Sequence, residues 1–149
     1  MDLSKSDEAE LEKAIELQKV DKDDESLSLL QDLHARNPEN YKVSGMLGLV
    51  LGGKFEKRDQ AIPYLEYAVS NSNYELFHLA LYIAYAKTEV YDKAFSTLFN
   101  YLKKNPATLF KDTLEELLEG LTKGFGTNYK DEIIEFSKQN DVPIPDVLS

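Results

Sequence analysis

The sequence predicts an all-α fold built from consecutive pairs of short helices. Apolar residues recur at spacings of three and four along most of the chain, which is the period of an amphipathic helix. No segment shows the alternating pattern, rich in β-branched side chains, that is typical of a strand. In addition, Pro38 and Pro106 lie 68 residues apart, which is twice 34. A fixed period of this length indicates an internal helical repeat.

The period of 34 residues is also visible between these prolines. Sliding the sequence on itself by 34 superimposes two sets of residues in the first helix of each unit: Ala14, Gly48 and Tyr82, and then Leu17, Leu51 and Tyr85. In the second helices, with one residue inserted in the middle unit, small residues and leucines align: Ser26 and Leu30, Ala61 and Leu65, and Ala94 and Leu98. Small residues let helices approach closely, so we expect Gly48 to lie where the two helices of its hairpin cross.

The first unit, at about residues 7–40, shows how each pair is delimited. Its first helix is followed by an acidic turn at 21–24, and its second helix carries three leucines at helical spacing. The second helix is expected to end at Asn37 and Pro38, because proline cannot continue a helix and asparagine is a good residue to begin the next one.

The second and third units, at about 41–73 and 74–106, repeat this arrangement. The third unit has a turn at 88–91 and a second helix that ends before Asn105 and Pro106. In the middle unit Ser72 and Asn73 stand where the proline is expected.

After Pro106 the repeat is weaker, and the sequence predicts a pair of capping helices over residues 107–140. A glycine-rich turn at 124–127 separates the two helices and is expected to act as a helix C-cap. Acidic residues that suit a polar outer face follow on both helices: Glu115, Glu116, Glu119, Asp131, Glu132 and Glu135. The tail at 141–149 contains two prolines and is expected to be extended and mobile. The whole chain, 1–149, is expected to be a single domain.

Small residues at one place in each helix, aromatics three residues later and a terminal proline resemble the tetratricopeptide repeat (TPR). The middle unit is equally similar to the Sel-like repeat. The resemblance implies a right-handed α-solenoid of helical hairpins, with three TPR-like units and a C-terminal helical cap. The sequence departs from the TPR pattern at Tyr82, which is large for its position, and at Ser72 and Asn73.

Charge and composition exclude several classes of function. The formal net charge is −10, so the chain would repel the phosphates of nucleic acid and attract basic proteins. The longest nearly uncharged apolar stretch, 43–53, is too short to span a membrane, and the polar start at 1–10 does not resemble a signal peptide. There is no cysteine, which is compatible with a reducing compartment. We therefore expect a cytoplasmic protein.

The sequence contains no convincing catalytic or metal-binding pattern. His34 and His78 lack a second ligand at helical spacing, so no metal is expected. Acidic residues at 21–32 have the spacing of a calcium loop, but Ser26 stands where that loop requires glycine. No carboxylate pair is assigned to a desolvated pocket that would separate two pKa values. We expect neither an enzyme nor a cofactor.

The TPR resemblance implies that the first helices of successive units line a concave groove. Register then assigns these partner-binding residues: Glu8, Leu11, Glu12, Ile15, Lys42, Leu49, Leu76, Leu79 and Ile83. TPR clamps for acidic chaperone tails use Lys, Asn and Arg at such positions, whereas the residues here are mostly apolar. An apolar groove with an acidic edge suits a basic or amphipathic helix or peptide.

Three functions are consistent with this groove. The first is a non-catalytic scaffold for protein–protein interaction. The second is a chaperone for an apolar secreted protein, similar to class II chaperones of type III secretion, and the third is an immunity protein that neutralises a basic toxin. Alternatively, the same residues pack against one another, against the C-terminal cap or against a second copy of the chain in a homodimer.

Overall fold

The computed structural model describes residues 2–149, and it confirms that the fold is all-α. Within that range there are eight α-helices, two short 3-10 helices and no strand. The helices are α1 (Lys5–Lys19), α2 (Asp23–Arg36), α3 (Tyr41–Gly52), α4 (Arg58–Asn71), α5 (Glu75–Lys87), α6 (Tyr91–Leu102), α7 (Lys111–Thr122) and α8 (Lys130–Gln139), with η1 (Thr127–Tyr129) and η2 (Asp146–Leu148).

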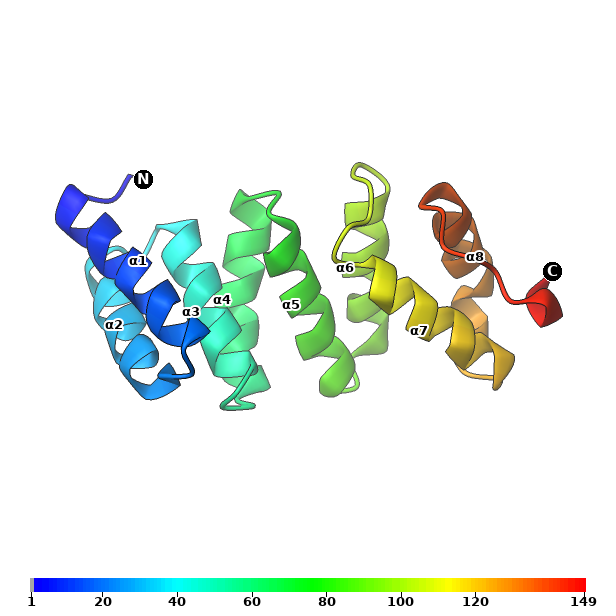
Figure 1. Ribbon diagram of the computed structural model, residues 1–149, viewed down its shortest axis with the longest axis horizontal. Coiled ribbons are helices and arrows are strands. Elements are labelled where there is room, and N and C mark those ends of the chain that lie inside the picture. The colour runs from blue at the N-terminus through cyan, green and yellow to red at the C-terminus, as the bar shows by residue number, and fades with distance from the viewer. Residues whose placement is uncertain (1) are drawn as a thin grey trace. The chain divides into compact units, whose positions relative to one another are not determined.

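The chain separates into two compact units, the first ending at Ala94 and the second beginning at Phe95. In the first unit, α1 packs on α2, α2 on α3, α3 on α4 and α4 on α5. The first helix of each pair also contacts the first helix of the next, since α1 meets α3 and α3 meets α5. The helices α1, α3 and α5 therefore lie side by side (Figure 1).

Close helix crossings in the first unit occur where the sequence places small residues. The crossing of α3 and α4 confirms the prediction for Gly48, because a Cβ on this glycine would lie 2.6 Å from Leu65 Cγ and 3.3 Å from the Ala61 carbonyl oxygen. At the crossing of α1 and α2, the buried Ser26 Oγ donates a hydrogen bond of 2.7 Å to the carbonyl oxygen of Ala14. Small residues thus allow the two helices of each hairpin to pack closely together.

Asparagines end the second helices, but in a different role from the one predicted. Asn37 was expected to be the N-cap of the following helix. Instead, its side-chain amide donates a hydrogen bond to the carbonyl of Leu33, four residues earlier. The N-cap of α3 is Asn40. The same bond to the residue four positions earlier is made by three other asparagines, with lengths of 2.8–2.9 Å: Asn71, Asn105 and Asn140. These asparagines lie 34 or 35 residues apart.

The turns between paired helices show the same period. The first residue with a positive φ in each turn is Asp21 (61°), Glu56 (53°), Glu89 (64°) or Gly124 (87°), and the last turn contains a second one, Gly126 (74°). The chain forms a Schellman turn after α1 and another after α5. Lys22 N donates to Leu17 O in the first and Val90 N donates to Tyr85 O in the second, and both hydrogen bonds are 2.8 Å long. The turn after α7 is built alike, with Phe125 N bonded to Gly120 O at 2.9 Å. This confirms the predicted helix C-cap at 124–127.

The second unit is held together by aromatic side chains. Phe95 stacks on Tyr129 with ring centroids 4.0 Å apart, and Phe99 stacks on Phe136 at 5.4 Å. The expectation of an extended, mobile tail is wrong in part, because Val142 is buried and η2 lies against α7. Val142 N also donates to the carbonyl of Ser137 at 2.9 Å, which ties the start of the tail to the end of α8.

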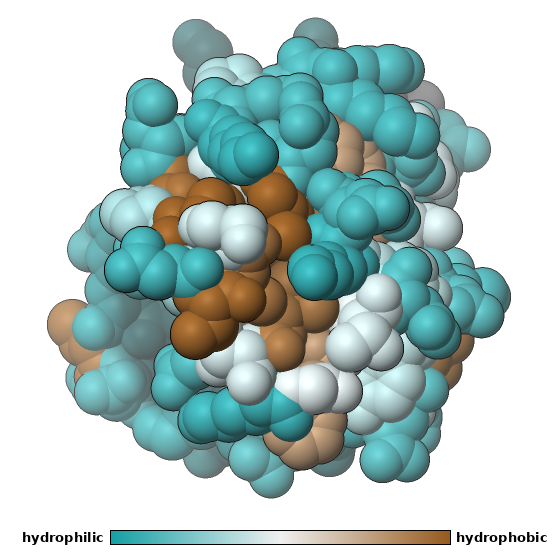
Figure 2. All heavy atoms as spheres, turned by 90° about the vertical axis from the view of Figure 1, so that its right-hand side faces the viewer, coloured by the Kyte–Doolittle hydropathy of each residue, from teal (hydrophilic) through white to brown (hydrophobic). Residues whose placement is uncertain are grey.

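The surface of the second unit is less polar than a capping face predicts. The acidic residues of α7 and α8 are exposed as expected. However, Figure 2 looks onto the side where α8 and the C-terminus lie in Figure 1, and apolar side chains gather there within a ring of hydrophilic ones. Phe125 and Val147 are the most exposed large apolar residues of this unit, at 69% and 78%.

None of the helices within residues 2–149 combines the length and the apolar composition that crossing a membrane requires.

Candidate functional site

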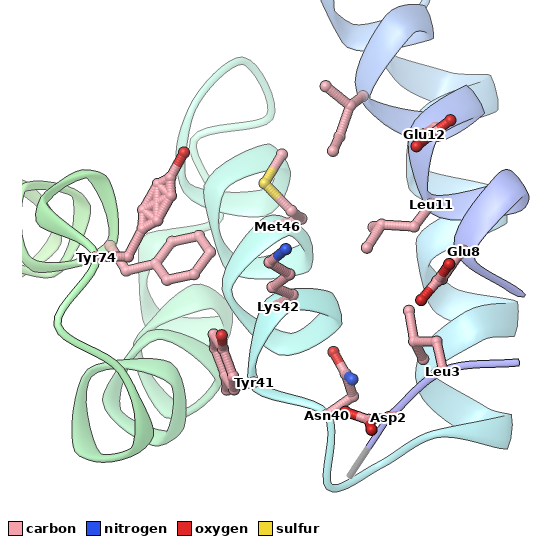
Figure 3. A pocket seen from close by; sticks show the side chains of 12 residues that line it. Asp2, Leu3, Glu8, Leu11, Glu12, Asn40, Tyr41, Lys42, Met46 and Tyr74 are labelled. Carbon is pink, nitrogen blue, oxygen red and sulfur yellow. The ribbon is translucent and has the colours of Figure 1, made fainter. Parts of the chain in front are cut away.

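The candidate site is a groove of about 530 Å³ on the face of the first unit formed by α1, α3 and α5 (Figure 3). Its volume lies within the range of roughly 300–1,000 Å³ that is usual for binding sites. It is lined by residues from the N-terminal segment and all three helices: Asp2, Leu3, Glu8, Leu11, Glu12, Ile15, Asn40, Tyr41, Lys42, Met46, Tyr74 and Phe77.

Helical spacing brings the lining residues of α1 and α3 onto facing sides. On α1 they are separated by three and four residues, which places them in one stripe. On α3, Lys42 and Met46 are one turn apart, and in Figure 3 both lie between Leu11 on one side and Tyr74 on the other. The start of α3 is fixed by Asn40, whose side chain accepts a 3.1 Å hydrogen bond from Val43 N.

The floor of the groove is apolar and firmly packed. Leu11 is 6% exposed and belongs to the core of the first unit, while Met46 and Ile15 are half-buried against that core. Phe77 is 1% exposed, and its ring lies against Gly45 of α3. Since Gly45 has no side chain, the ring packs directly on the backbone of α3 and forms part of the floor of the groove.

Charged residues of opposite sign lie on the two sides of this floor. Glu8 and Glu12 are exposed on α1, Asp2 is exposed in the segment before α1, and Lys42 is exposed on α3. None of the four forms an ion pair with another described residue. The groove therefore offers three carboxylates and one ammonium group whose hydrogen-bonding capacity is left to solvent or to a ligand.

Other acids of α1 are already engaged. Arg36, at the end of α2, pairs with Asp7 at 3.0 Å and also with Glu10. Hydrogen bonds from the Asn37 amide and the Arg36 guanidinium hold the pKa of Asp7 below its ordinary value. Glu16 pairs with Lys19 at 3.3 Å. These contacts fasten α1 to α2 or stay within α1, and they leave the groove charges unpaired.

Two titratable groups of α5 do not line the groove but contact the preceding helix or its C-cap. His78 Nε2 is 3.1 Å from the carbonyl oxygen of Ser72, and burial lowers the pKa of this imidazole. The Tyr85 hydroxyl donates to the Glu66 carboxylate of α4 at 2.5 Å, and burial together with this carboxylate raises the pKa of the phenol far above its ordinary value. These contacts join α5 to α4 and to Ser72, the C-cap of α4.

The structure divides the residues that sequence register assigned to partner binding. Those that line the groove are Glu8, Leu11, Glu12, Ile15 and Lys42, and those that do not are Leu49, Leu76, Leu79 and Ile83. Leu49, Leu76 and Leu79 are half-buried, and Ile83 is 40% exposed. Their role in binding stays a prediction.

The difference lies in the face of α5 that the groove uses. With 3.6 residues per turn, Leu79 projects about 160° and Ile83 about 120° around the helix from Phe77. The groove instead uses Phe77 and Tyr74, the residue just before α5. The missed residues also include Asp2, Leu3, Asn40, Tyr41 and Met46, of which Met46 was detectable because it follows Lys42 by one turn.

Among residues 2–149 no three His, Cys, Asp or Glu side chains are grouped in a way that could hold a metal ion.

Comparisons with known proteins do not place the chain in a family. No protein-family model matches the sequence. No curated protein matches it either.

Proposed function

We propose that this chain is a non-catalytic, cytoplasmic interaction module, an α-solenoid of the TPR type that binds a segment of another protein in the groove between α1, α3 and α5. The observation that carries the proposal is the groove itself, which has an apolar floor and unpaired charges on both sides. Apolar clefts with a few convergent polar groups are the usual form of a binding site.

Two local features support the repeat arrangement. The positive-φ turn residues lie 35, 33 and 35 residues apart, and the terminal asparagines lie 34, 34 and 35 residues apart. Both series continue into α7 and α8, so the C-terminal pair has the same turn and helix-end features as the three pairs before it. In solenoids of the TPR type the first helices of successive units form the binding surface, as the TPR resemblance implies.

The chemistry of the groove favours a protein segment over other ligands. Nucleic acid would bring phosphates toward Glu8 and Glu12 in a chain whose net charge is −10. The floor offers Leu11, Met46 and Phe77, which suit the apolar side of an amphipathic helix or an extended apolar peptide. A chaperone for a secreted protein and an immunity protein are special cases that differ only in the owner of the bound segment.

Site-specific photo-crosslinking tests the proposal in the native host. A benzophenone amino acid at position 46 would lie in the groove, and the same residue at Val20, in the turn after α1 and 62% exposed, is the control. We expect a discrete protein adduct from position 46 and none from position 20, with the linked segment identified by mass spectrometry. Equal adducts from both positions, or none from position 46, would refute the groove as the binding site.

A further inference from the structure

The two sides of the groove differ in charge, and this difference restricts what can fill it. Glu8 and Glu12 stand on α1, and Lys42 stands on α3 with Met46 next to it (Figure 3). Elsewhere in the first unit some acids and bases do pair, as Arg36 does with Asp7. Lys42, by contrast, forms no ion pair with the carboxylates that line the groove, which are Asp2, Glu8 and Glu12.

A bound segment would take these charges out of water. Removing an ion from water costs several kcal/mol unless a partner of opposite charge replaces the solvent. A ligand that covers the floor must accordingly bring cations to Glu8 and Glu12 and an anion to Lys42. A uniformly basic segment would place a positive charge against Lys42. A uniformly acidic segment would place negative charges against Glu8 and Glu12.

Spacing adds a geometric restriction. Glu8 and Glu12 are four residues apart, so they lie about 6 Å apart along the axis of α1. A second helix that lies along α1 presents side chains at positions i and i+4 with the same separation. Its apolar stripe then covers Leu11 and Met46, and its opposite edge lies over Lys42.

Building on the function proposed above, we propose that the groove selects an amphipathic helix whose two polar edges carry opposite charge. One edge bears Lys or Arg at i and i+4 and lies against α1. The other edge bears a carboxylate that meets Lys42. Between them an apolar stripe covers the floor of the groove.

Three synthetic helical peptides of about 15 residues test this selection. They share one leucine stripe and a fluorescent label and differ only at their edges: lysine on one and glutamate on the other, lysine on both, or glutamine on both. Reversing a helix in the groove exchanges its edges, so one bipolar peptide suffices. Binding is measured by fluorescence anisotropy, with sedimentation velocity to detect a second copy of the chain in the groove.

We expect the bipolar peptide to bind wild-type protein about two- to fivefold more tightly than either control for each ion pair it gains. Lys42→Glu should reverse the order, so that the all-lysine peptide binds best. Lys13→Glu makes the same charge change on α1 outside the groove and should leave the order unchanged.

The outcomes separate this inference from the proposed function. Equal affinities for all three peptides, or an order that Lys42→Glu does not alter, would refute charge selection while the groove remains a binding site. A crosslinked partner at position 46 together with no peptide binding would also refute the inference alone. If the protein forms a dimer that Lys42→Glu dissociates, the groove is occupied by a second copy of the chain, and the inference is overturned. Failure of both crosslinking and peptide binding would remove the proposed function as well.

Discussion

Phe77 occupies the space that a side chain at Gly45 would need, since a Cβ on this glycine would lie 2.4 Å from the Phe77 Cζ atom. The contact joins α3 to α5 and forms the floor of the groove. Because Phe77 is 1% exposed, the ring has little room to move aside. One missing methyl group thus sets the approach of two helices.

Substitution of this glycine should therefore destabilise the protein. Overpacking a core costs about 1–3 kcal/mol, which outweighs the gain of up to about 1 kcal/mol from replacing glycine in a helix. We expect Gly45→Ala to lower the free energy of unfolding in urea, and Gly48→Leu to do the same. Gly120→Ala is the matched control in α7, where the added Cβ would lie 3.8 Å from Phe125, and it should be neutral or stabilising. Equal effects at positions 45 and 120 would contradict the close contact.

Two buried serines should respond in opposite ways to removal of the hydroxyl group. Ser26 Oγ donates to the Ala14 carbonyl, so Ser26→Ala should lower the free energy of unfolding by about 1 kcal/mol. Ser137 Oγ is buried without a hydrogen-bond partner in the described part of the chain, so Ser137→Ala should be neutral or stabilising. Urea unfolding followed by circular dichroism compares the two. Destabilisation by Ser137→Ala would reveal a partner for that hydroxyl.

The turn after α5 should become more stable with glycine. Glu89 has φ of 64°, a conformation that glycine adopts without steric cost. We expect Glu89→Gly to raise the free energy of unfolding by roughly 0.5–1 kcal/mol, and Glu89→Val to lower it, because a β-branched residue resists this conformation. Thermal melts of the two variants show directly whether each substitution stabilises or destabilises the protein. The idea of a strained turn fails if valine is tolerated as well as glycine.

Glu8, Glu12 and Glu16 follow one another at intervals of four residues and form an acidic stripe on α1, but only the first two should affect association. Glu8 and Glu12 line the groove, whereas Glu16 lies outside it and pairs with Lys19. We expect the double variant Glu8→Gln, Glu12→Gln to slow association of the bipolar peptide in stopped-flow experiments at low salt, and the difference to shrink above about 0.15 M salt. Glu16→Gln should leave the rate unchanged. A common rate for all three proteins would mean that the stripe only faces solvent.

Stability should fall on mild acidification because of His78. Burial lowers the pKa of this imidazole in the folded state, whereas in the unfolded chain the pKa is about 6.5. The unfolded state then binds the proton more readily, so the free energy of unfolding decreases as the pH drops below about 6.5 and is unaffected well above it.

Urea titrations between pH 7.5 and pH 5 measure this effect, and His78→Gln should flatten the dependence. Asp7, whose pKa is depressed, contributes in a separate window, where stability is lost as the pH falls below about 4. An unchanged slope in His78→Gln would assign the acid sensitivity to other groups.

The sequence predicts the helices well because their determinants are local. Helical spacing predicted three helix pairs and a C-terminal pair, and the structure contains these eight helices. The aligned residues Leu17, Leu51 and Tyr85 are also those whose carbonyls accept the closing bonds of the first three turns, which the sequence analysis did not predict. By contrast, asparagine can cap either end of a helix, so the sequence alone did not show that Asn37 closes α2.

The candidate site was only half predictable. The α1 side follows from periodicity, since Glu8, Leu11 and Glu12 lie on one stripe. The α5 side depends on how that helix is rotated, and this rotation is set by a tertiary contact, the ring of Phe77 against Gly45. The tail was misjudged because two prolines suggest an extended segment, whereas burial of Val142 fixes its start.

The serial packing of the first unit has a consequence for how fast it folds. The main contacts of each helix in the first unit are with its neighbours in the chain, and α3 also contacts α1 and α5. Little of the chain must be brought together over long distances, so the entropy lost on closing loops is small at every step. Helical proteins of such low contact order fold in microseconds to milliseconds. A helix pair can also fray from the N-terminus without disrupting the others, so α1 and α2 can exchange amide hydrogens faster than α3 and α4.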